Sequence, residues 1–290
     1  MSRQRLHSFR WASLLFVVAV GTAETARGGS VSVLYQSFGS SGISAINLTN
    51  PPTGLAGLGD SASYLAYGGG NLYFSSGNTV YWTSQNLTGL NTFRSFGGPI
   101  TGLAVDAADH ILYLSGGGEV AAISLTNPNV GYGALNINAS NLDFSGGSLY
   151  FSSGNTIYSS SKYLSGLNTV KSFGGLVTGL AVDAADHILY VAGGGEAASI
   201  SLTNPNLGYG ALNINASNLV AGDGMVYIQS GDTIYSSSKY LQGLNTVLTS
   251  NSLPVDLALF SAPEPSTCTL VLAGLPMLLG LARRLRRRKP

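Results

Sequence analysis

The stretch from Thr101 to Asn141 reads TGLAVDAADHILYLSGGGEVAAISLTNPNVGYGALNINASN, and it returns almost unchanged 77 residues later, from Thr178 to Asn218. Within it, the decapeptide AVDAADHILY is identical at residues 104–113 and 181–190. A chain that repeats itself at a fixed spacing builds its fold by stacking one structural unit on the next. This repeat therefore decides the architecture.

The 77-residue unit contains two related halves of about 38 residues, a length typical of one β-propeller blade. Each half has four apolar, β-branched or aromatic runs separated by Gly, Asn, Ser and Asp, the pattern of a four-stranded antiparallel sheet. In one half we expect strands at Gly102–Asp106, Ile111–Ser115, Val120–Leu125 and Tyr132–Ile137.

The two ends of the repeat array complement each other. The segment from Val33 to Pro51 matches part of the repeat but lacks the LAVD strand that should precede it, whereas PVDLALF at Pro254–Phe260 matches that strand alone. If the last strand completes the first blade, the sheet edges are removed by closure. We therefore predict an all-β, six-bladed β-propeller with four-stranded blades over residues 31–260. A β-helix or a pair of sandwiches is the alternative that this spacing fits less well.

The repeat LAVDAADHILYLSGGGEVAAISL also resembles those of YWTD-type and NHL-type six-bladed propellers. The resemblance covers most of the chain after the N-terminal segment. The YWTD tetrapeptide itself is replaced, by LYFS at residues 72–75 and 149–152. The resemblance therefore implies a fold rather than a ligand.

The N-terminal segment over residues 1–23 predicts a signal peptide. Three arginines precede a short apolar run over residues 11–20, which is followed by Gly21-Thr22-Ala23. Signal peptidase recognises this order of basic, apolar and small residues. We expect cleavage after Ala23 or, alternatively, after Ala26. A permanent anchor would need a run of about 20 apolar residues.

The segment APEPSTCTLVLAGLPMLLGLARRLRRRKP, at residues 262–290, resembles a PEP-CTERM sorting signal. Its motif is Pro263-Glu264-Pro265, and residues 268–282 predict a transmembrane helix roughly 22 Å long. By the positive-inside rule a basic cluster holds the end of such a helix in the cytoplasm. The resemblance implies processing by an exosortase and delivery to the surface or extracellular matrix of a bacterium; an ordinary tail anchor is the alternative. The basic cluster consists of Arg283, Arg284, Arg286, Arg287, Arg288 and Lys289.

The charge of the chain changes sign when its ends are set aside. The whole sequence has a net charge of +1, but residues 24–265 hold five basic and all thirteen acidic residues, which gives −8. An acidic body repels phosphate backbones, so we expect no nucleic acid partner. Cys268 is the single cysteine, so no disulfide forms within the chain.

Two acidic turns repeat at the ends of the LAVD strands. Carboxylates gathered there could hold Ca²⁺, but strand-end aspartates usually accept hydrogen bonds from backbone amides, and we expect no cofactor. Two histidines occupy the same turns without a third ligand, so we expect no metal site there. The residues concerned are Asp106, Asp109, Asp183, Asp186, His110 and His187.

Catalysis needs a set of acid, base or metal ligands, whereas the copies of this repeat differ by substitutions such as Leu114 for Val191 and Val120 for Ala197. Nucleophile, phosphate-loop and zinc motifs do not occur. We therefore expect a protein that is not an enzyme. A propeller hydrolase or lyase acting on an envelope sugar or lactone is the alternative, and convergent acidic and Asn side chains in the channel would favour it.

A binding surface, unlike a catalytic site, can be formed by the same side chains repeated in several blades. Tyrosines recur at 77-residue intervals, at 73, 150 and 227 and again at 81, 158 and 235, while Tyr163 matches Tyr240. Exposed aromatic rings can stack on sugars, although aromatics in strands usually pack between blades. Trp82 is a candidate ligand contact because its counterparts are Ser159 and Ser236.

The sequence thus predicts a secreted or cell-surface propeller that binds or scaffolds in the extracellular matrix, with exopolysaccharide as a candidate partner. A surface adhesin or ice-surface binder is a further alternative, but it would need a flat Thr-rich face that these strands do not show.

Overall fold

The computed structural model describes residues 32–48 and 52–261. The predicted signal peptide, the Pro263-Glu264-Pro265 motif, the predicted helix at 268–282 and the basic cluster lie outside the described residues. Within residues 32–48 and 52–261, no helix is long and apolar enough to cross a bilayer.

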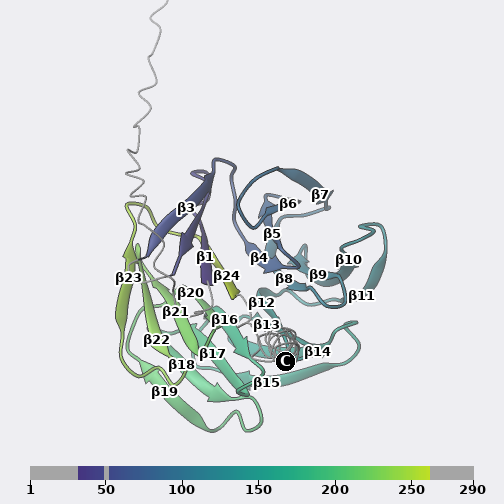
Figure 1. Cartoon of the computed structure of the whole chain (residues 1–290). Helices are drawn as coiled ribbons and strands as arrows, with labels where there is room; N and C mark the ends of the chain where they lie inside the picture. Colours follow the sequence, from purple (N-terminus) through teal and green to yellow (C-terminus); the bar gives the residue numbers. More distant parts are fainter. Residues whose placement is uncertain (1–31, 49–51, 262–290) are drawn as a thin grey trace, which may run out of the picture. The chain divides into compact units, whose positions relative to one another are not determined.

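The described residues form six four-stranded antiparallel sheets, which we number as blades I to VI in order around a central axis (Figure 1). The innermost strands of successive blades contact one another all the way round, from β4 through β8, β12, β16 and β20 to β24 and back to β4. The prediction of an all-β, six-bladed propeller with four-stranded blades is confirmed.

Each blade is named here from its innermost to its outermost strand. Blade I has β24 (Asp256–Ser261), β1 (Ser32–Ser37), β2 (Ile43–Asn47) and β3 (Thr53–Leu58). Blade II has β4 (Leu65–Gly68), β5 (Asn71–Ser76), β6 (Thr79–Ser84) and β7 (Asn91–Ser95). Blade III has β8 (Ile100–Asp106), β9 (Ile111–Gly116), β10 (Glu119–Ser124) and β11 (Gly131–Leu135).

Blades IV to VI repeat this order. Blade IV has β12 (Ser140–Ser145), β13 (Ser148–Ser153), β14 (Thr156–Ser161) and β15 (Leu167–Ser172). Blade V has β16 (Val177–Asp183), β17 (Ile188–Gly193), β18 (Glu196–Ser201) and β19 (Gly208–Leu212). Blade VI has β20 (Asn218–Gly222), β21 (Met225–Ser230), β22 (Thr233–Ser238) and β23 (Asn245–Thr249).

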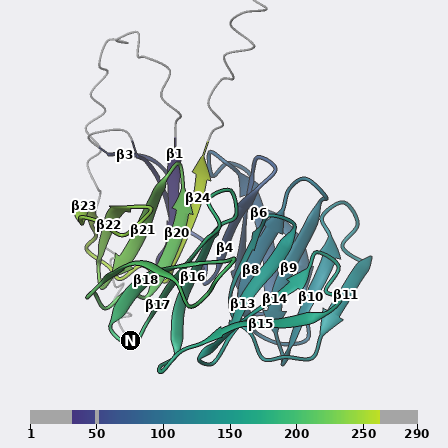
Figure 2. The ribbon, with the colours of Figure 1, turned by 90° about the horizontal axis from the view of Figure 1, so that it is seen from below.

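The ring closes through blade I, as the sequence predicts. Strand β24 runs antiparallel beside β1, with Tyr35 opposite Ala258 and Gln36 opposite Leu257 (Figure 2). The innermost strand of blade I therefore comes from the far end of the described chain, and every blade has the same four-stranded order.

The outermost strand of blade III ends earlier than the sequence predicts, at Leu135 rather than Ile137. The amide of Ile137 donates to the carbonyl of Leu135 at 2.9 Å, a tight turn that directs the chain into the next blade. The other three strands of this blade match the prediction to within two residues.

The apolar core is divided among the blade interfaces. Six clusters of buried side chains lie one at each junction between neighbouring blades. At alternate junctions a fully buried tyrosine anchors the cluster, namely Tyr35, Tyr113 and Tyr190. Because each sheet buries both faces against its neighbours, the blades form one rigid ring.

Candidate functional site

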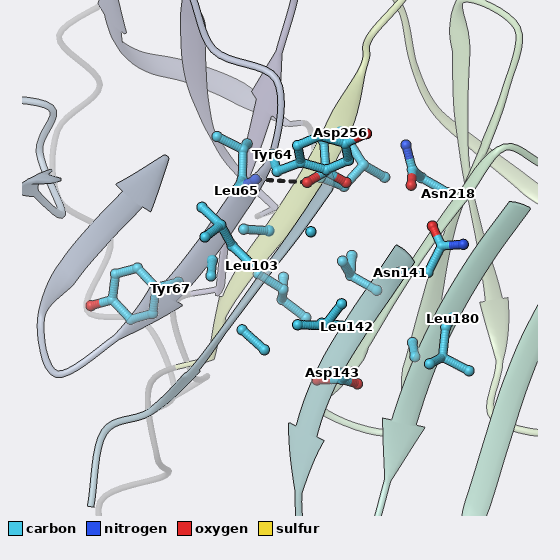
Figure 3. A pocket seen from close by; sticks show the side chains of 18 of the residues that line it. Tyr64, Leu65, Tyr67, Leu103, Asn141, Leu142, Asp143, Leu180, Asn218 and Asp256 are labelled. Carbon is cyan, nitrogen blue, oxygen red and sulfur yellow. Dashed lines mark hydrogen bonds between the residues drawn. The ribbon is translucent and has the colours of Figure 1, made fainter. Parts of the chain in front are cut away.

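The central channel is the first candidate site. The innermost strands of all six blades line a cavity of about 180 Å³. Its polar side chains come from six residues, Tyr64, Tyr67, Asn141, Asp143, Asn218 and Asp256 (Figure 3). Acidic and Asn side chains in the channel would favour the alternative that the protein is a hydrolase or lyase. The hydrogen bonds of each of these side chains therefore need to be considered.

Asp256 belongs to the closing strand β24 and stands where the two earlier copies have Gly102 and Gly179. Its Oδ2 atom accepts a hydrogen bond of 2.7 Å from the backbone amide of Leu65 in blade II, drawn as a dashed line in Figure 3. Burial in the narrow channel raises the pKa of Asp256 to about 7, although the amides of Leu65 and Leu257 partly oppose this.

Asp143 in β12 makes the same kind of link between blades IV and V, three junctions further round the ring. Its Oδ2 atom accepts a hydrogen bond of 2.6 Å from the amide of Val182, in the innermost strand of blade V. Burial raises the pKa of Asp143 to about 6. Its counterparts in the other copies are Ala66 and Val220, so this link exists once.

The two asparagines also connect neighbouring blades. The side-chain amide of Asn141 donates to the carbonyl of Val177 at 3.1 Å, and that of Asn218 donates to the carbonyl of Val255 at 2.8 Å. The two aspartates and the two asparagines thus satisfy backbone groups next to or within the innermost strand of the following blade. Each of these four side chains is already hydrogen-bonded across a blade junction.

A second candidate site lies between the outer parts of blades III and IV. Tyr132 in β11 is 40% exposed and Tyr163, which follows β14, is 48% exposed. Their ring centroids are 5.9 Å apart and the ring planes meet at 52°. Two aromatic rings therefore form an open angle at the surface.

A lysine and an aspartate complete this group. Lys162 Nζ lies 2.6 Å from the carboxylate of Asp109 and 5.0 Å from the centroid of the Tyr163 ring. The hydrogen bond from Lys162 lowers the pKa of Asp109. We call Tyr132, Tyr163, Lys162 and Asp109 the first tyrosine site; it contains both charges and has no net charge.

The same four side chains recur between blades V and VI. Tyr209 and Tyr240 are 37% and 41% exposed, with centroids 5.8 Å apart at 55°. Lys239 Nζ lies 2.9 Å from the carboxylate of Asp186 and 5.3 Å from the Tyr240 centroid. We call these four residues the second tyrosine site.

The third position of this kind, between blades I and II, has different side chains. Leu55, Gln85 and Asn86 stand where the two sites have a tyrosine, the lysine and the second tyrosine. The turn itself is kept, because Leu87 has a φ of 56° as Leu164 does. The chain thus has two tyrosine sites and one matched position without them.

Glycine allows the two halves of each tyrosine site to meet. A Cβ atom on Gly133 would lie 2.2 Å from the carbonyl oxygen of Tyr163, and one on Gly210 would lie 2.0 Å from that of Tyr240. The position without tyrosines has Ala56 instead. The GYG sequence of β11 and β19 therefore brings the strand against the turn of the next blade.

The acidic turns predicted from the sequence are hydrogen-bonded to backbone. Asp106 Oδ1 accepts from the amides of Ala108 at 3.0 Å and Asp109 at 3.2 Å, and Asp183 accepts from the amide of Asp186 at 3.1 Å. Asp109 and Asp186 form the ion pairs of the tyrosine sites. Among the residues that the structure describes, no three His, Cys, Asp or Glu side chains gather as metal ligands do.

The two histidines of the same turns, His110 and His187, are exposed and have positive φ. Trp82 lies in β6, opposite Tyr73 and Asn91, and is half-buried against the cluster between blades II and III. Part of its ring is therefore accessible, and it stays a candidate contact.

Four residues of these sites, Asp143, Asp256, Tyr132 and Tyr209, were not predicted from the sequence. Asp143 and Asp256 were detectable as departures from the repeat register, since their counterparts are Ala66 and Gly179. Tyr132 and Tyr209 were hidden because GYGAL is identical in both copies and looks like an ordinary outer strand.

No protein-family model matches the chain, and no curated protein is significantly similar to it. Among solved structures, a chain in the crystal structure of a nidogen/laminin complex has a TM-score of 0.68 and 12% sequence identity. The match covers 80% of this chain and 98% of that one. It supports the resemblance to YWTD-type six-bladed propellers at the level of fold. Since 1222 solved chains match, the fold alone assigns no function.

Proposed function

We propose that this protein is a non-catalytic, secreted or cell-surface propeller that binds or scaffolds in an extracellular matrix. The observation that carries the proposal is the pair of tyrosine sites. The same exposed rings, at nearly the same angle, stand at two equivalent junctions of one rigid ring. Rigid, exposed tyrosines supply contact area with little loss of side-chain entropy, which suits binding.

The contacts in the channel support a binding role as well. Asp143 and Asp256 accept hydrogen bonds from backbone amides of the next blade. A catalytic acid or base must instead present its carboxyl group to a substrate. The solved chain of similar fold belongs to a nidogen/laminin complex, which is consistent with a propeller that binds a partner.

The proposed localisation rests on the sequence motifs near the two ends of the chain. The segment over residues 1–23 would engage signal peptidase, and Pro263-Glu264-Pro265 would be processed by an exosortase while residues 268–282 pass through the membrane. The protein would then reach the surface or matrix of a bacterium, with exopolysaccharide as a candidate partner.

Retention on the matrix of the producing organism tests the binding role. Every described strand pairs within residues 32–261, so residues 30–263 can be purified as the propeller. We expect this protein to sediment with washed matrix. The retained amount of the double variant Tyr163→Asn/Tyr240→Asn should be lower by at least about tenfold. Both substitutions introduce asparagine, which is the residue at position 86 in the equivalent turn between blades I and II.

The matched control is Asn86→Ala at the position without tyrosines, which should be retained like the wild type. A Trp82→Ser variant, which copies Ser159 and Ser236, tests the half-buried tryptophan as an independent contact. Equal retention of the wild type and the double variant would contradict the proposal.

A second candidate function is supported by the raised pKa of Asp143 and Asp256, because a carboxyl group that titrates near neutral pH can act as a general acid or base. In that case the protein would be a hydrolase or lyase acting on an envelope sugar or lactone. Turnover of such substrates that is abolished by Asp143→Asn or Asp256→Asn, with the fold intact, would establish it and overturn the non-catalytic proposal.

A further inference from the structure

We propose that the two tyrosine sites bind one neutral polysaccharide chain at two points. This rests on the proposed function and adds the chemical class of the ligand. One sugar unit of the polysaccharide would pack against the two tyrosine rings of each site. Three features of the sites carry it: their shape, their charge and their duplication.

The shape of each site suits a flat, amphipathic ligand. The two tyrosine rings meet at 52° in the first site and 55° in the second, and all four rings are more than a third exposed. An exposed aromatic ring offers an apolar face with a polar hydroxyl at its edge. A pyranose ring has the matching pattern, with C–H groups on its face and hydroxyls around its rim.

The charge of each site favours a neutral ligand. Lys162 is paired with Asp109 at 2.6 Å, and Lys239 is paired with Asp186 at 2.9 Å. A polyanion would have to compete with these carboxylates and approach a body that carries a net charge of −8 over residues 24–265. A neutral glycan would instead use the ammonium and carboxylate groups as hydrogen-bond donors and acceptors.

The duplication favours a ligand that repeats itself. The sites are two blades apart in a ring of six, so they are related by one third of a turn. They are held by the same rigid core, and their internal distances agree to within 0.3 Å for each pair of equivalent contacts. A polymer of identical units presents the same group to both sites, and the second contact then forms at high effective concentration.

The experiment compares a polymer with its own fragments. The probes are the neutral and the anionic polysaccharide fractions of the producer's matrix, separated by ion exchange, and short oligosaccharides cut from the neutral fraction. We expect the propeller to bind the neutral polymer at least about tenfold more tightly than its oligosaccharides, because only the polymer engages both sites.

Single and double variants separate one-point from two-point binding. Tyr163→Asn or Tyr240→Asn alone should remove the tenfold advantage of the polymer and halve the number of oligosaccharides bound. The double variant should bind neither probe, and Asn86→Ala should bind both as the wild type does. Thermal melting of each variant checks that the ring is intact, and Tyr132→Leu, which copies Leu55, is a second way to open the first site.

Three results would overturn the inference: no binding of the neutral polymer, a preference for the anionic fraction, or equal binding by the double variant. Matrix whose sugar rings have been opened by periodate oxidation of their vicinal diols distinguishes this failure from failure of the proposed function. If retention on that matrix still depends on Tyr163 and Tyr240, the binding role stands and the partner is a protein.

Discussion

The carboxylate of Asp256 in the last strand of the ring accepts a hydrogen bond from the backbone amide of Leu65, in the innermost strand of blade II, at 2.7 Å. This bond ties the closing strand to the next blade. Because Asp256 keeps its proton up to a pH of about 7, the strength of this tie depends on pH.

Stability should fall as the pH rises from about 4 to about 7. An unfolded aspartate loses its proton near pH 3.8, whereas folded Asp143 and Asp256 keep theirs to about 6 and about 7. The folded state therefore binds more protons in this range, and raising the pH favours unfolding. We expect a loss on the order of 5 kcal/mol, measured by urea unfolding at pH 4.5 and pH 7.5.

The double variant Asp143→Asn/Asp256→Asn is the control for this pH dependence. Asparagine keeps a carbonyl oxygen that can accept the same amide hydrogen bonds, but it does not titrate. Its free energy of unfolding should change much less over the same pH range. A wild type that becomes more stable toward pH 7.5 would show that other groups dominate.

Removal of the closing strand should unfold the ring. Deleting residues 254–260 leaves the inner edge of β1 unpaired, removes Leu257 from the cluster between blades VI and I, and exposes Leu34 of that cluster. We expect loss of the cooperative melting transition in circular dichroism. A chain that ends at residue 263 should melt like one that retains the tail, and an unaffected deletion variant would refute closure.

The Gly133→Ala variant should damage the first tyrosine site. Its new methyl group would lie 2.2 Å from the carbonyl oxygen of Tyr163, so the turn that holds Tyr163 and Lys162 must move. We expect a destabilisation of about 1–3 kcal/mol, measured by urea unfolding. Gly131→Ala is the matched control in the same strand, since its methyl group would be 3.9 Å from the carbonyl oxygen of Ala122, an ordinary van der Waals contact. Equal losses in the two variants would mean that the close approach to Tyr163 is not what requires glycine.

Replacing Pro263-Glu264-Pro265 with three alanines should leave an unprocessed, membrane-bound precursor. The motif is the expected point of exosortase processing, so without it the tail would keep the propeller at the membrane. Cell fractionation and immunoblotting of the full chain would show a larger band in the membrane fraction. Release of a normally sized protein would argue against sorting through this motif.

The repeat predicted the blades because strand alternation and turn residues are local properties, and a period of 77 residues makes them visible twice. Closure was predictable for the same reason, since Leu257 and Ala258 continue the register of Leu180 and Ala181. The outer strand of blade III ended two residues early because a tight turn at Ile137 competes with the ladder.

The sites were less predictable because they form between blades. Tyr132 meets Tyr163, and Asp256 meets Leu65, only once the ring curvature brings neighbouring sheets together. Sequence spacing carries no information about that curvature. The repeat could show that Tyr163 and Tyr240 are equivalent, but not that each has a second ring beside it.

The order in which the ring is made follows from the pairing of β1 with β24. Strand β1 leaves the ribosome, or the export channel, well before residues 256–261, so its inner edge has no partner while the intervening five blades are produced. An unpaired edge of this kind can capture a strand from another chain. Folding of this propeller is therefore completed late, and a delay in delivering its last strand would expose newly made chains to misassembly with one another.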